Sequence, residues 1–248
     1  ISKNIIRDGF QDGILLTNNA ATVTVSQNSI YNNTGLGINL VADYLEPNTG
    51  FIPTLNDAND ADTGANGFLN FPIIQSAVLA GSNLIVSGCA PAGAIIELFE
   101  ADVSPGGAAT LGANTFTPRT LDYGEGQTYL SSITEGSAGD TDSGTCSSPI
   151  DDLDGNDQTG MNKFSFSIPI PSGIVSDDLL TATSTLANAT SEFSPIAMVR
   201  SNDYGDAPLS YGQVGHAVIG PILGTLRDVD SSYPAAPGLL ADADDTTG

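Results

Sequence analysis

The sequence has no tryptophan, one histidine, two cysteines and six lysine or arginine residues among its 248 residues. Against these six cations stand 29 aspartate or glutamate residues, which give a formal net charge of −23. This balance argues against nucleic acid and anionic membranes as partners, because a strongly negative field repels both. The single histidine, His216, has no second ligand histidine and no cysteine pair at metal spacing, so neither a zinc site nor a Ser-His-Asp triad has support.

Long hydrophobic runs are also missing. No apolar stretch approaches the roughly 18 residues that span a bilayer, so we expect no membrane insertion. No long stretch has the apolar period of an amphipathic helix, whereas glycine (28 residues) and short polar side chains are abundant. The sequence therefore predicts an all-β fold. The chain begins at Ile1 inside a repeat and without an initiator methionine, so we expect it to be a portion of a longer protein.

The first 40 residues contain a repeat with an offset of 24 residues. Residues 1–6 match residues 25–30, and residues 13–16 match residues 37–40. Strand-turn-strand units of this period stack into a parallel β-helix, in which Asn4 and Asn28 are suited to form an asparagine ladder at one corner. The alternative is a chance similarity. We expect a stack of parallel strands here.

The segment that follows supports this interpretation through a resemblance. Residues 56–66 have the sequence NDANDADTGAN, and Leu69–Pro72 follow. This stretch resembles the motif that closes the right-handed parallel β-helix of large bacterial surface proteins, and the resemblance covers about residues 1–75. It implies that residues 1–72 are the terminal rungs and cap of such a helix.

Acidic residues crowd this closing loop. Asp57, Asp60 and Asp62 lie within six positions, with Asn66 nearby. Carboxylates this close repel one another unless a cation neutralises them, and calcium binds six to eight oxygen ligands in irregular loops. The spacing is not that of an EF-hand. We therefore expect a structural calcium site, and the alternative is a solvated acidic turn.

From residue 73 onwards the pattern changes to short alternating strands separated by glycine, proline and asparagine turns, which predicts an immunoglobulin-like sandwich over residues 73–199. Residues 180–183 (LTAT) and 190–194 (TSEFS) resemble the end of the Ig-like module that follows the β-helix in the same proteins. The predicted strands are Ile73–Leu79, Asn83–Ser87, Ile95–Ala101, Thr128–Ile133, Lys163–Ile168, Leu179–Ser184 and Ser191–Val199.

The two cysteines are Cys89, at the end of a predicted strand, and Cys146, in a long loop. One pair in a glycine-rich, lysine-poor chain predicts a disulfide formed in an oxidising compartment, and the alternative is two buried thiols. The bridge would close a loop of 57 residues, worth roughly 4 kcal/mol in the chain-entropy model. The same long loop carries a second candidate calcium site, for which the alternative is a solvated acidic loop. Its expected ligands are Asp152, Asp154, Asn156 and Asp157.

The last 46 residues carry the most specific pattern. Residues 203–212 (DYGDAPLSYG), then His216, resemble the opening of the GEVED domain, a bacterial extracellular β-module. The sequence departs from that pattern at Leu209, Ile222 and Asp230. The resemblance implies that residues 200–248 are the N-terminal part of such a domain. It also implies a cation role for Asp228, Asp230, Asp242, Asp244 and Asp245.

These observations predict a structural or adhesive segment of a secreted bacterial surface or matrix protein, stabilised by calcium. We expect no enzymatic activity, because the carboxylates Asp8 and Asp12, beside Lys3 and Arg7, are best interpreted as exposed turn residues. The expected partners are neighbouring copies of the chain, assembled into filaments, or components of the cell surface or matrix. The alternative is a β-helix protein that binds or cleaves polysaccharide.

Overall fold

The computed structural model describes residues 1–17, 22–42, 53–102, 123, 125–142, 144–146 and 156–201 in full, and the backbone of residues 202–204 and 215–217. These residues form strands and one short 3₁₀ helix, η1 (Ala65–Phe68). The predicted all-β class is therefore confirmed. No helix in this described part has the length and hydrophobicity to cross a membrane.

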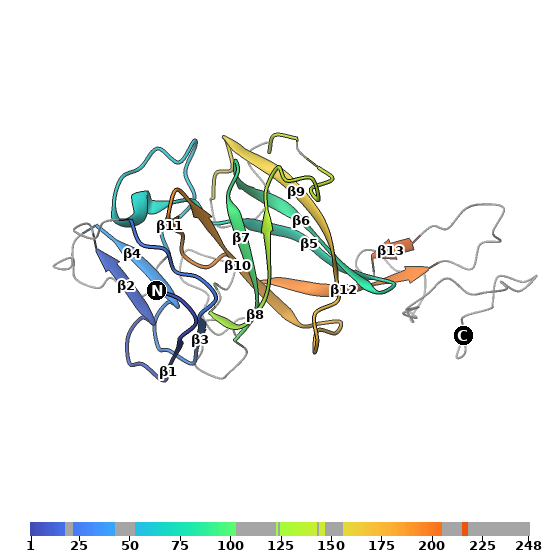
Figure 1. The fold of residues 1–248 in the computed structure, drawn as a ribbon, viewed down its shortest axis with the longest axis horizontal. Helices are drawn as coiled ribbons and strands as arrows, with labels where there is room; N and C mark the ends of the chain where they lie inside the picture. The colour runs from blue at the N-terminus through green and yellow to red at the C-terminus, as the bar shows by residue number, and fades with distance from the viewer. Residues whose placement is uncertain are drawn as a thin grey trace, which may run out of the picture.

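The N-terminal strands form two stacked coils, here named the first coil (residues 1–17) and the second coil (residues 22–42). Strand β1 (Ile5–Arg7) pairs with β3 (Ser29–Tyr31), and β2 (Ile14–Thr17) pairs with β4 (Ile38–Val41). Both pairs are parallel, and in both the partners are 24 residues apart, as the sequence repeat predicts. Figure 1 shows the two coils at one end of the molecule.

The predicted asparagine ladder is confirmed. The side-chain amide of Asn4 donates to Oδ1 of Asn28 at 3.0 Å, and the backbone N–H of Asn4 donates to the same oxygen at 3.0 Å. A second contact of this kind follows, because the backbone N–H of Gly9 donates to Oδ1 of Asn33 at 3.0 Å. Buried side-chain amides thus supply the hydrogen-bond partners that backbone N–H groups in the turns between strands would otherwise lack. The coils also repeat their left-handed turn residues, which are Lys3 and Gln27, and Asp8 and Asn32.

The rest of the described chain forms one curled sheet of nine strands. Its main path runs β8-β7-β10-β12-β5-β6-β9, with β11 paired to β10 and β13 paired to β12. The strands are β5 (Ile73–Ala80), β6 (Asn83–Pro91), β7 (Ile95–Ala101), β8 (Gly126–Thr134), β9 (Met161–Pro169), β10 (Leu179–Leu186), β11 (Ala189–Thr190), β12 (Ala197–Tyr204) and β13 (Gly215–Ala217).

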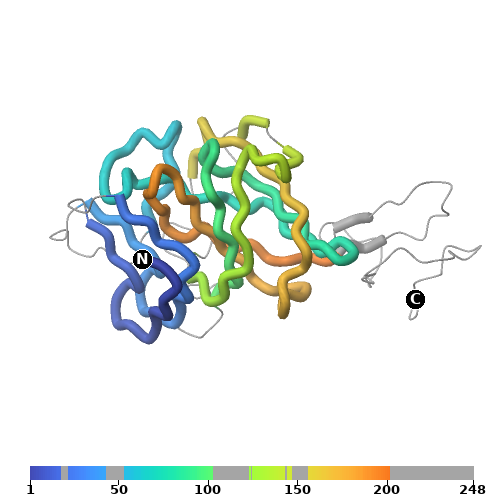
Figure 2. The backbone as a smooth tube through the Cα atoms, in the orientation of Figure 1, coloured from blue at the N-terminus to red at the C-terminus, as the bar shows by residue number. Residues whose placement is uncertain are grey.

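The sheet curls around an apolar core. Strand β12 joins the two halves of the sheet, because it pairs antiparallel with β10 and parallel with β5. Side chains from both halves meet inside, including Leu84 and Phe164 from one half and Leu98 and Leu180 from the other, each with at most 1% of its surface exposed. Figure 2 shows the two halves facing each other beside the coils.

One predicted strand is wrong over most of its length. The strand expected over Ser191–Val199 begins at Ala197, and residues 191–194 have no regular structure. Hydroxyl groups take over the ladder bonds there: the backbone N–H of Ala182 donates to Oγ of Ser194, and that of Ser184 donates to Oγ of Ser191, both at 2.9 Å. Residues 191–194 therefore do not continue as a strand, and their side chains can turn toward the coils.

The predicted disulfide between Cys89 and Cys146 is confirmed, with 6.2 Å between the two Cα atoms. Both cysteines are buried and pack against Met161. The bond attaches the described segment 144–146 to β6 near one edge of the sheet, where Thr145 also forms a bridge with Asn162 of the edge strand β9. The chain therefore has a covalent clamp beside the start of β9.

Candidate metal centre and its junction

The acidic loop, defined here as residues 53–72, connects the coils to β5 (Figure 2). Its turn places two consecutive non-glycine residues, Asn59 and Asp60, in the left-handed region, with φ of 63° and 51°. Asparagine and aspartate tolerate this conformation better than most residues. The loop is held from outside, because the N–H of Asn59 donates to the carbonyl of Thr159 at 2.7 Å.

The turn brings three predicted ligands together. Asp57, Asp60 and Asp62 each offer a carboxylate oxygen, and these oxygens lie within 4.8 Å of one another. Two ion pairs are found among the described residues, Arg7 with Asp8 and Arg200 with Asp177, and neither involves this cluster. Three negative charges thus share a small volume without a side-chain cation.

Hydrogen bonds within the loop fix two of the three carboxylates. Both oxygens of Asp57 accept the N–H of Ala61 at 3.1 Å, and Oδ1 of Asp60 accepts the N–H of Asn70 at 2.8 Å. Asn70 also binds the backbone of Asp57 through both of its side-chain polar atoms. Oδ1 of Asp62 is closed off from solvent and has no partner among the described residues, although Asp62 as a whole is only half-buried.

Burial raises the pKa values of Asp60 and Asp62. Burial, followed by the charges of Asp57 and Asp60, raises the pKa of Asp62 to about 6. The pKa of Asp60 is also raised, chiefly because surrounding atoms crowd its carboxyl, although the residue remains exposed; the hydrogen bond from Asn70 opposes this. A hard divalent cation would relieve the repulsion, since calcium prefers carboxylate and carbonyl oxygens in flexible geometry.

Asn66, the fourth predicted ligand of this site, has a different role. Its Oδ1 accepts the N–H of Val23 at 2.7 Å, and its amide donates to the carbonyls of Val23 at 2.7 Å and Thr190 at 2.8 Å. Asn66 is buried, with 5% of its surface exposed. Its side chain therefore joins the acidic loop to the second coil and to β11 of the curled sheet.

The described members of the second predicted site lie against the same acidic loop. Oδ1 of Asn156 accepts the N–H of Asn56 at 2.9 Å, and the N–H of Asp157 donates to the carbonyl of Asn56 at 2.9 Å. Asn156 also donates to the hydroxyl of Tyr123. The segment after the long loop thus packs against the acidic loop beside Asp57. The remaining predicted ligands lie outside the described residues: Asp152, Asp154, Asp228, Asp230, Asp242, Asp244 and Asp245.

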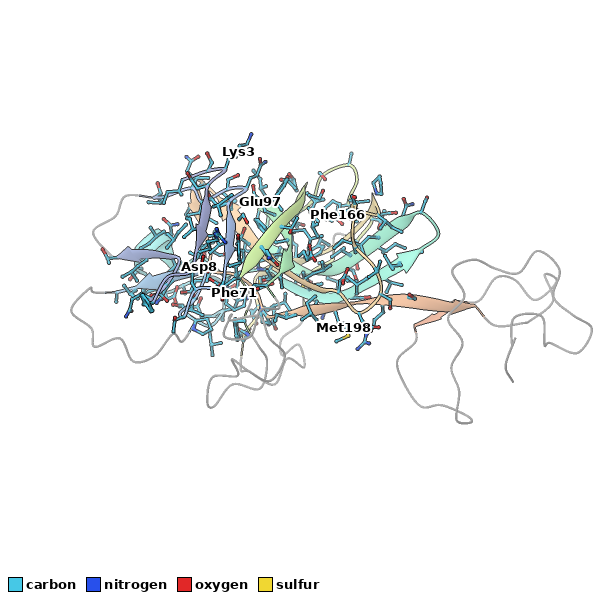
Figure 3. All side chains as sticks on the ribbon, turned by 90° about the horizontal axis from the view of Figure 1, so that it is seen from below. Lys3, Asp8, Phe71, Glu97, Phe166 and Met198 are labelled. Atoms are coloured by element: carbon cyan, nitrogen blue, oxygen red, sulfur yellow. A yellow bond between two sulfur atoms is a disulfide. The ribbon has the colours of Figure 1, made fainter. Side chains whose placement is uncertain are left out.

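Four buried carboxylates that the sequence patterns did not reveal cover the lower edge of the second coil, the edge that faces the curled sheet. Each accepts a backbone N–H of the second coil: Gln27 donates to Glu97, Asn32 to Asp102, Asn33 to Glu125 and Leu40 to Glu192, over 2.7 to 3.0 Å. All four acidic residues have at most 4% of their surface exposed. Figure 3 shows Glu97 where the coil strands meet the curled sheet.

Aromatic side chains complete this junction. Phe99 of β7 and Phe193 of the segment before β12 belong to the same apolar cluster as the inward residues of the coils, and their ring centroids are 5.4 Å apart. Phe193 occupies the space beside Gly37, where an added Cβ would lie 2.8 Å from its ring. The coils and the curled sheet therefore share this apolar cluster. One signal for the junction was present in the sequence, because Glu97 interrupts the apolar run Ile95–Phe99.

Glu125 is the most perturbed of the junction carboxylates. Burial raises its pKa to about 7, and the charges of Asp102 and Asp12 add to this effect. Hydrogen bonds from the backbone and the side chain of Asn33 act in the opposite direction. The junction therefore contains a buried carboxyl that titrates near neutral pH.

The carboxylates of the first coil are occupied by structural contacts. Asp12 accepts the N–H of Leu36 at 2.8 Å and the amide of Asn39 at 2.9 Å. Asp8 accepts the amide of Asn32 and pairs with Arg7. These contacts join the first coil to the second. No protein-family model matches this chain.

Proposed function

We propose that this chain is a load-bearing segment of a secreted bacterial surface or matrix protein, whose joint between two β modules is stiffened by calcium. In this proposal the coils are the end of a right-handed parallel β-helix and the curled sheet is an Ig-like sandwich. Parallel pairing at 24 residues, the asparagine ladder and the seven-strand path support these assignments. Residues 200–248 would begin a GEVED-like module.

The observation that carries the proposal is the cluster of Asp57, Asp60 and Asp62 in the loop between the two modules. The same loop contains Asn66, which bonds both the second coil and the sandwich. A cation bound at the cluster would hold this loop in its left-handed turn and thereby hold Asn66 in the joint. Calcium would act structurally, since nothing in this arrangement requires it to contact a substrate.

Two facts support an extracellular location in this proposal. A disulfide between Cys89 and Cys146 is typical of proteins that fold in an oxidising compartment. A net charge of −23 favours solubility and attracts divalent cations, which are abundant outside cells. The adhesive partner in this proposal is a component of the cell surface or matrix.

Thermal unfolding with calcium and with EGTA tests the proposal. A cation that binds the folded state stabilises it by mass action, by about 2.7 kcal/mol at a hundredfold excess over Kd. A gain of this size corresponds to a rise in Tm of roughly 5–10 °C for a domain of 150–250 residues. The double variant Asp60→Asn/Asp62→Asn should lose most of this rise, and Asp8→Asn, an exposed aspartate of the first coil, should keep it. An equal Tm in calcium and in EGTA would refute the proposal that calcium stabilises the joint between the two modules.

A further inference from the structure

Both ends of the curled sheet are covered by other parts of the chain. The main path of the sheet ends at β8 and at β9. Strand β8 contacts β3 of the second coil, and Oγ of Ser29 donates to the carbonyl of Gln127 at 2.6 Å. The outer side of β9 is covered by the clamp segment, defined here as residues 140–142 and 144–146. Edge strands with uncovered backbone groups pair with other chains, so the attachment of this segment decides whether β9 is protected.

The clamp segment is hydrogen-bonded to β9 much as a short antiparallel strand would be. The bonds run from the N–H of Thr141 to the carbonyl of Ser165 (2.9 Å), from the N–H of Lys163 to the carbonyl of Gly144 (2.6 Å), from the N–H of Cys146 to the carbonyl of Met161 (3.0 Å) and from the N–H of Ser165 to Oδ1 of Asp140 (2.8 Å). The opposite side of β9 pairs with β6. Alternate residues of a strand direct their backbone groups to opposite sides, so Ser167 continues the outer edge that Lys163 and Ser165 form.

The disulfide is the main attachment of the clamp segment. Residues 141–142 and 144–145 are exposed, and Cys146 is the buried residue in the described part of this segment. Cys146 is bonded to Cys89 on β6, and both pack against Met161. An exposed segment gains little from burial of apolar surface, and ordering its backbone costs conformational entropy. The covalent bond offsets this cost, because it restricts the segment before the segment docks.

Without the clamp segment, the outer edge of β9 is complementary to itself. Lys163, Ser165 and Ser167 direct their backbone groups outward, whereas the side chains of Phe164 and Phe166 lie in the core. An antiparallel pair centred on Ser165 places Lys163 of one copy opposite Ser167 of the other, so no like charges meet. The same residues then serve on both copies, as a two-fold interface requires.

We infer that the disulfide between Cys89 and Cys146 keeps the clamp segment over a self-association surface, and that in the reduced chain the outer edge of β9 pairs with the same edge of a second copy. The reductant is a dithiol: the S–S bond breaks, each cysteine sulfur gains one electron and one proton, and the dithiol is oxidised to a disulfide. Cys89 is 1% exposed and Cys146 is 8% exposed. A dithiol therefore reaches the bond in chains that open locally, or meets the two cysteines before they pair.

Sedimentation velocity tests this inference on the oxidised chain, the chain reduced with dithiothreitol, and the double variant Cys89→Ala/Cys146→Ala. The oxidised chain should sediment as a monomer, and the other two should form dimers with a dissociation constant at least about tenfold lower than that of the oxidised chain. Adding Ser165→Pro to the double variant removes the N–H at the centre of the outer edge and should restore the monomer. Ser165→Thr keeps that N–H, so it is the matched control and should preserve the dimer.

A cross-link identifies the strand that pairs. Ser165→Cys in the double variant gives each copy one cysteine, and the pairing sets the two cysteines opposite each other at a Cα separation that a disulfide can span. Oxidation should therefore join the two copies. Ser132→Cys, at an exposed position of β8, is the control and should leave the copies unjoined. Circular dichroism measures whether each variant keeps its β content.

Three results would overturn the inference. One is a reduced chain and a double variant that associate no more tightly than the oxidised chain. Another is association that cross-links the copies through Ser132→Cys and not through Ser165→Cys, whatever the proline variant shows. The third is loss of β content on reduction, because the clamp segment would then support the whole sheet and not one edge.

Discussion

The side chain of Asn66 forms a reciprocal pair of hydrogen bonds with the backbone of Val23, accepting its N–H and donating to its carbonyl, both at 2.7 Å. This pair imitates a backbone bridge between segments 43 residues apart. Because Asn66 also donates to Thr190, a single buried amide links the second coil, the acidic loop and the curled sheet.

Replacing Asn66 should loosen this three-way contact. Asn66→Ala leaves buried backbone groups of Val23 and Thr190 unpaired, so we expect a loss of about 2 kcal/mol in the free energy of unfolding. Asn66→Asp should cost more, because a carboxylate would face two carbonyl oxygens. Urea unfolding measures both changes. The matched control is Asn83→Asp at the start of β6, which should change stability little; equal effects of the two aspartate substitutions would contradict the role of Asn66.

Phe193 should also stabilise the contact between the coils and the curled sheet. Its ring contacts Phe99 and lies in the apolar cluster of the coils, so Phe193→Ala should cost about 3–5 kcal/mol. The volume-conserving Phe193→Leu should cost less. Hydrogen exchange adds the location of the effect, since amides of β3 and β4 should exchange faster than those of β6 in the alanine variant. A uniform increase in amide exchange across the molecule would indicate that the coils and the curled sheet unfold as one unit.

Stability should depend on pH through Glu125. Its pKa is raised to about 7 in the folded chain from an ordinary value of 4.5, so the folded state binds the proton more tightly than the unfolded state. The contribution is fully present below pH 4.5 and is lost as the pH rises to about 7. From the size of this shift we expect about 2–3 kcal/mol.

Comparison of the original chain with Glu125→Gln isolates this effect, because glutamine does not titrate. The difference in unfolding free energy between pH 5 and pH 8, measured by urea titration, should shrink in the variant. Glu100 is a half-buried glutamate on β7, and Glu100→Gln serves as the matched control. This control should keep the original difference in unfolding free energy between pH 5 and pH 8. An unchanged pH dependence in Glu125→Gln would contradict the assignment.

Calcium stabilisation should also depend on pH, with the opposite sign. Calcium competes with the proton on Asp62, whose pKa is raised to about 6, so the metal binds poorly once the pH falls below that value. Without calcium, Asp62 contributes less to the free energy of unfolding as the pH rises from 3.8 to about 6, because its pKa is raised in the folded chain. The rise in Tm on adding calcium should therefore be larger at pH 7.5 than at pH 5. A rise that is independent of pH would place the metal elsewhere.

Local patterns in the sequence predicted the features that depend on short-range order. The repeat fixed the register of β1 with β3 and of β2 with β4, and it placed Asn4 against Asn28. The predicted strand over Ile95–Ala101 coincides with β7, and the disulfide between Cys89 and Cys146 followed from composition. The carboxylate cluster was visible because its three members lie within six positions.

The features that the sequence did not predict depend on contacts between distant segments. Glu192 binds Leu40 across 152 positions, and Glu125 binds Asn33 across 92. Neither pair follows from periodicity, because each carboxylate is placed by the docking of one module on the other. The same docking explains why Ser191 and Ser194 leave the expected strand, and why Asn66 contacts Val23 rather than the aspartates.

Calcium titration after treatment with EGTA tests the central claim most directly. Isothermal titration calorimetry at pH 7.5 compares the original chain with the triple variant Asp57→Asn/Asp60→Asn/Asp62→Asn. We expect the variant to bind one calcium ion fewer per chain and to keep its disulfide and β content unchanged, as judged by thiol titration and circular dichroism. An equal number of bound calcium ions in both proteins would contradict it.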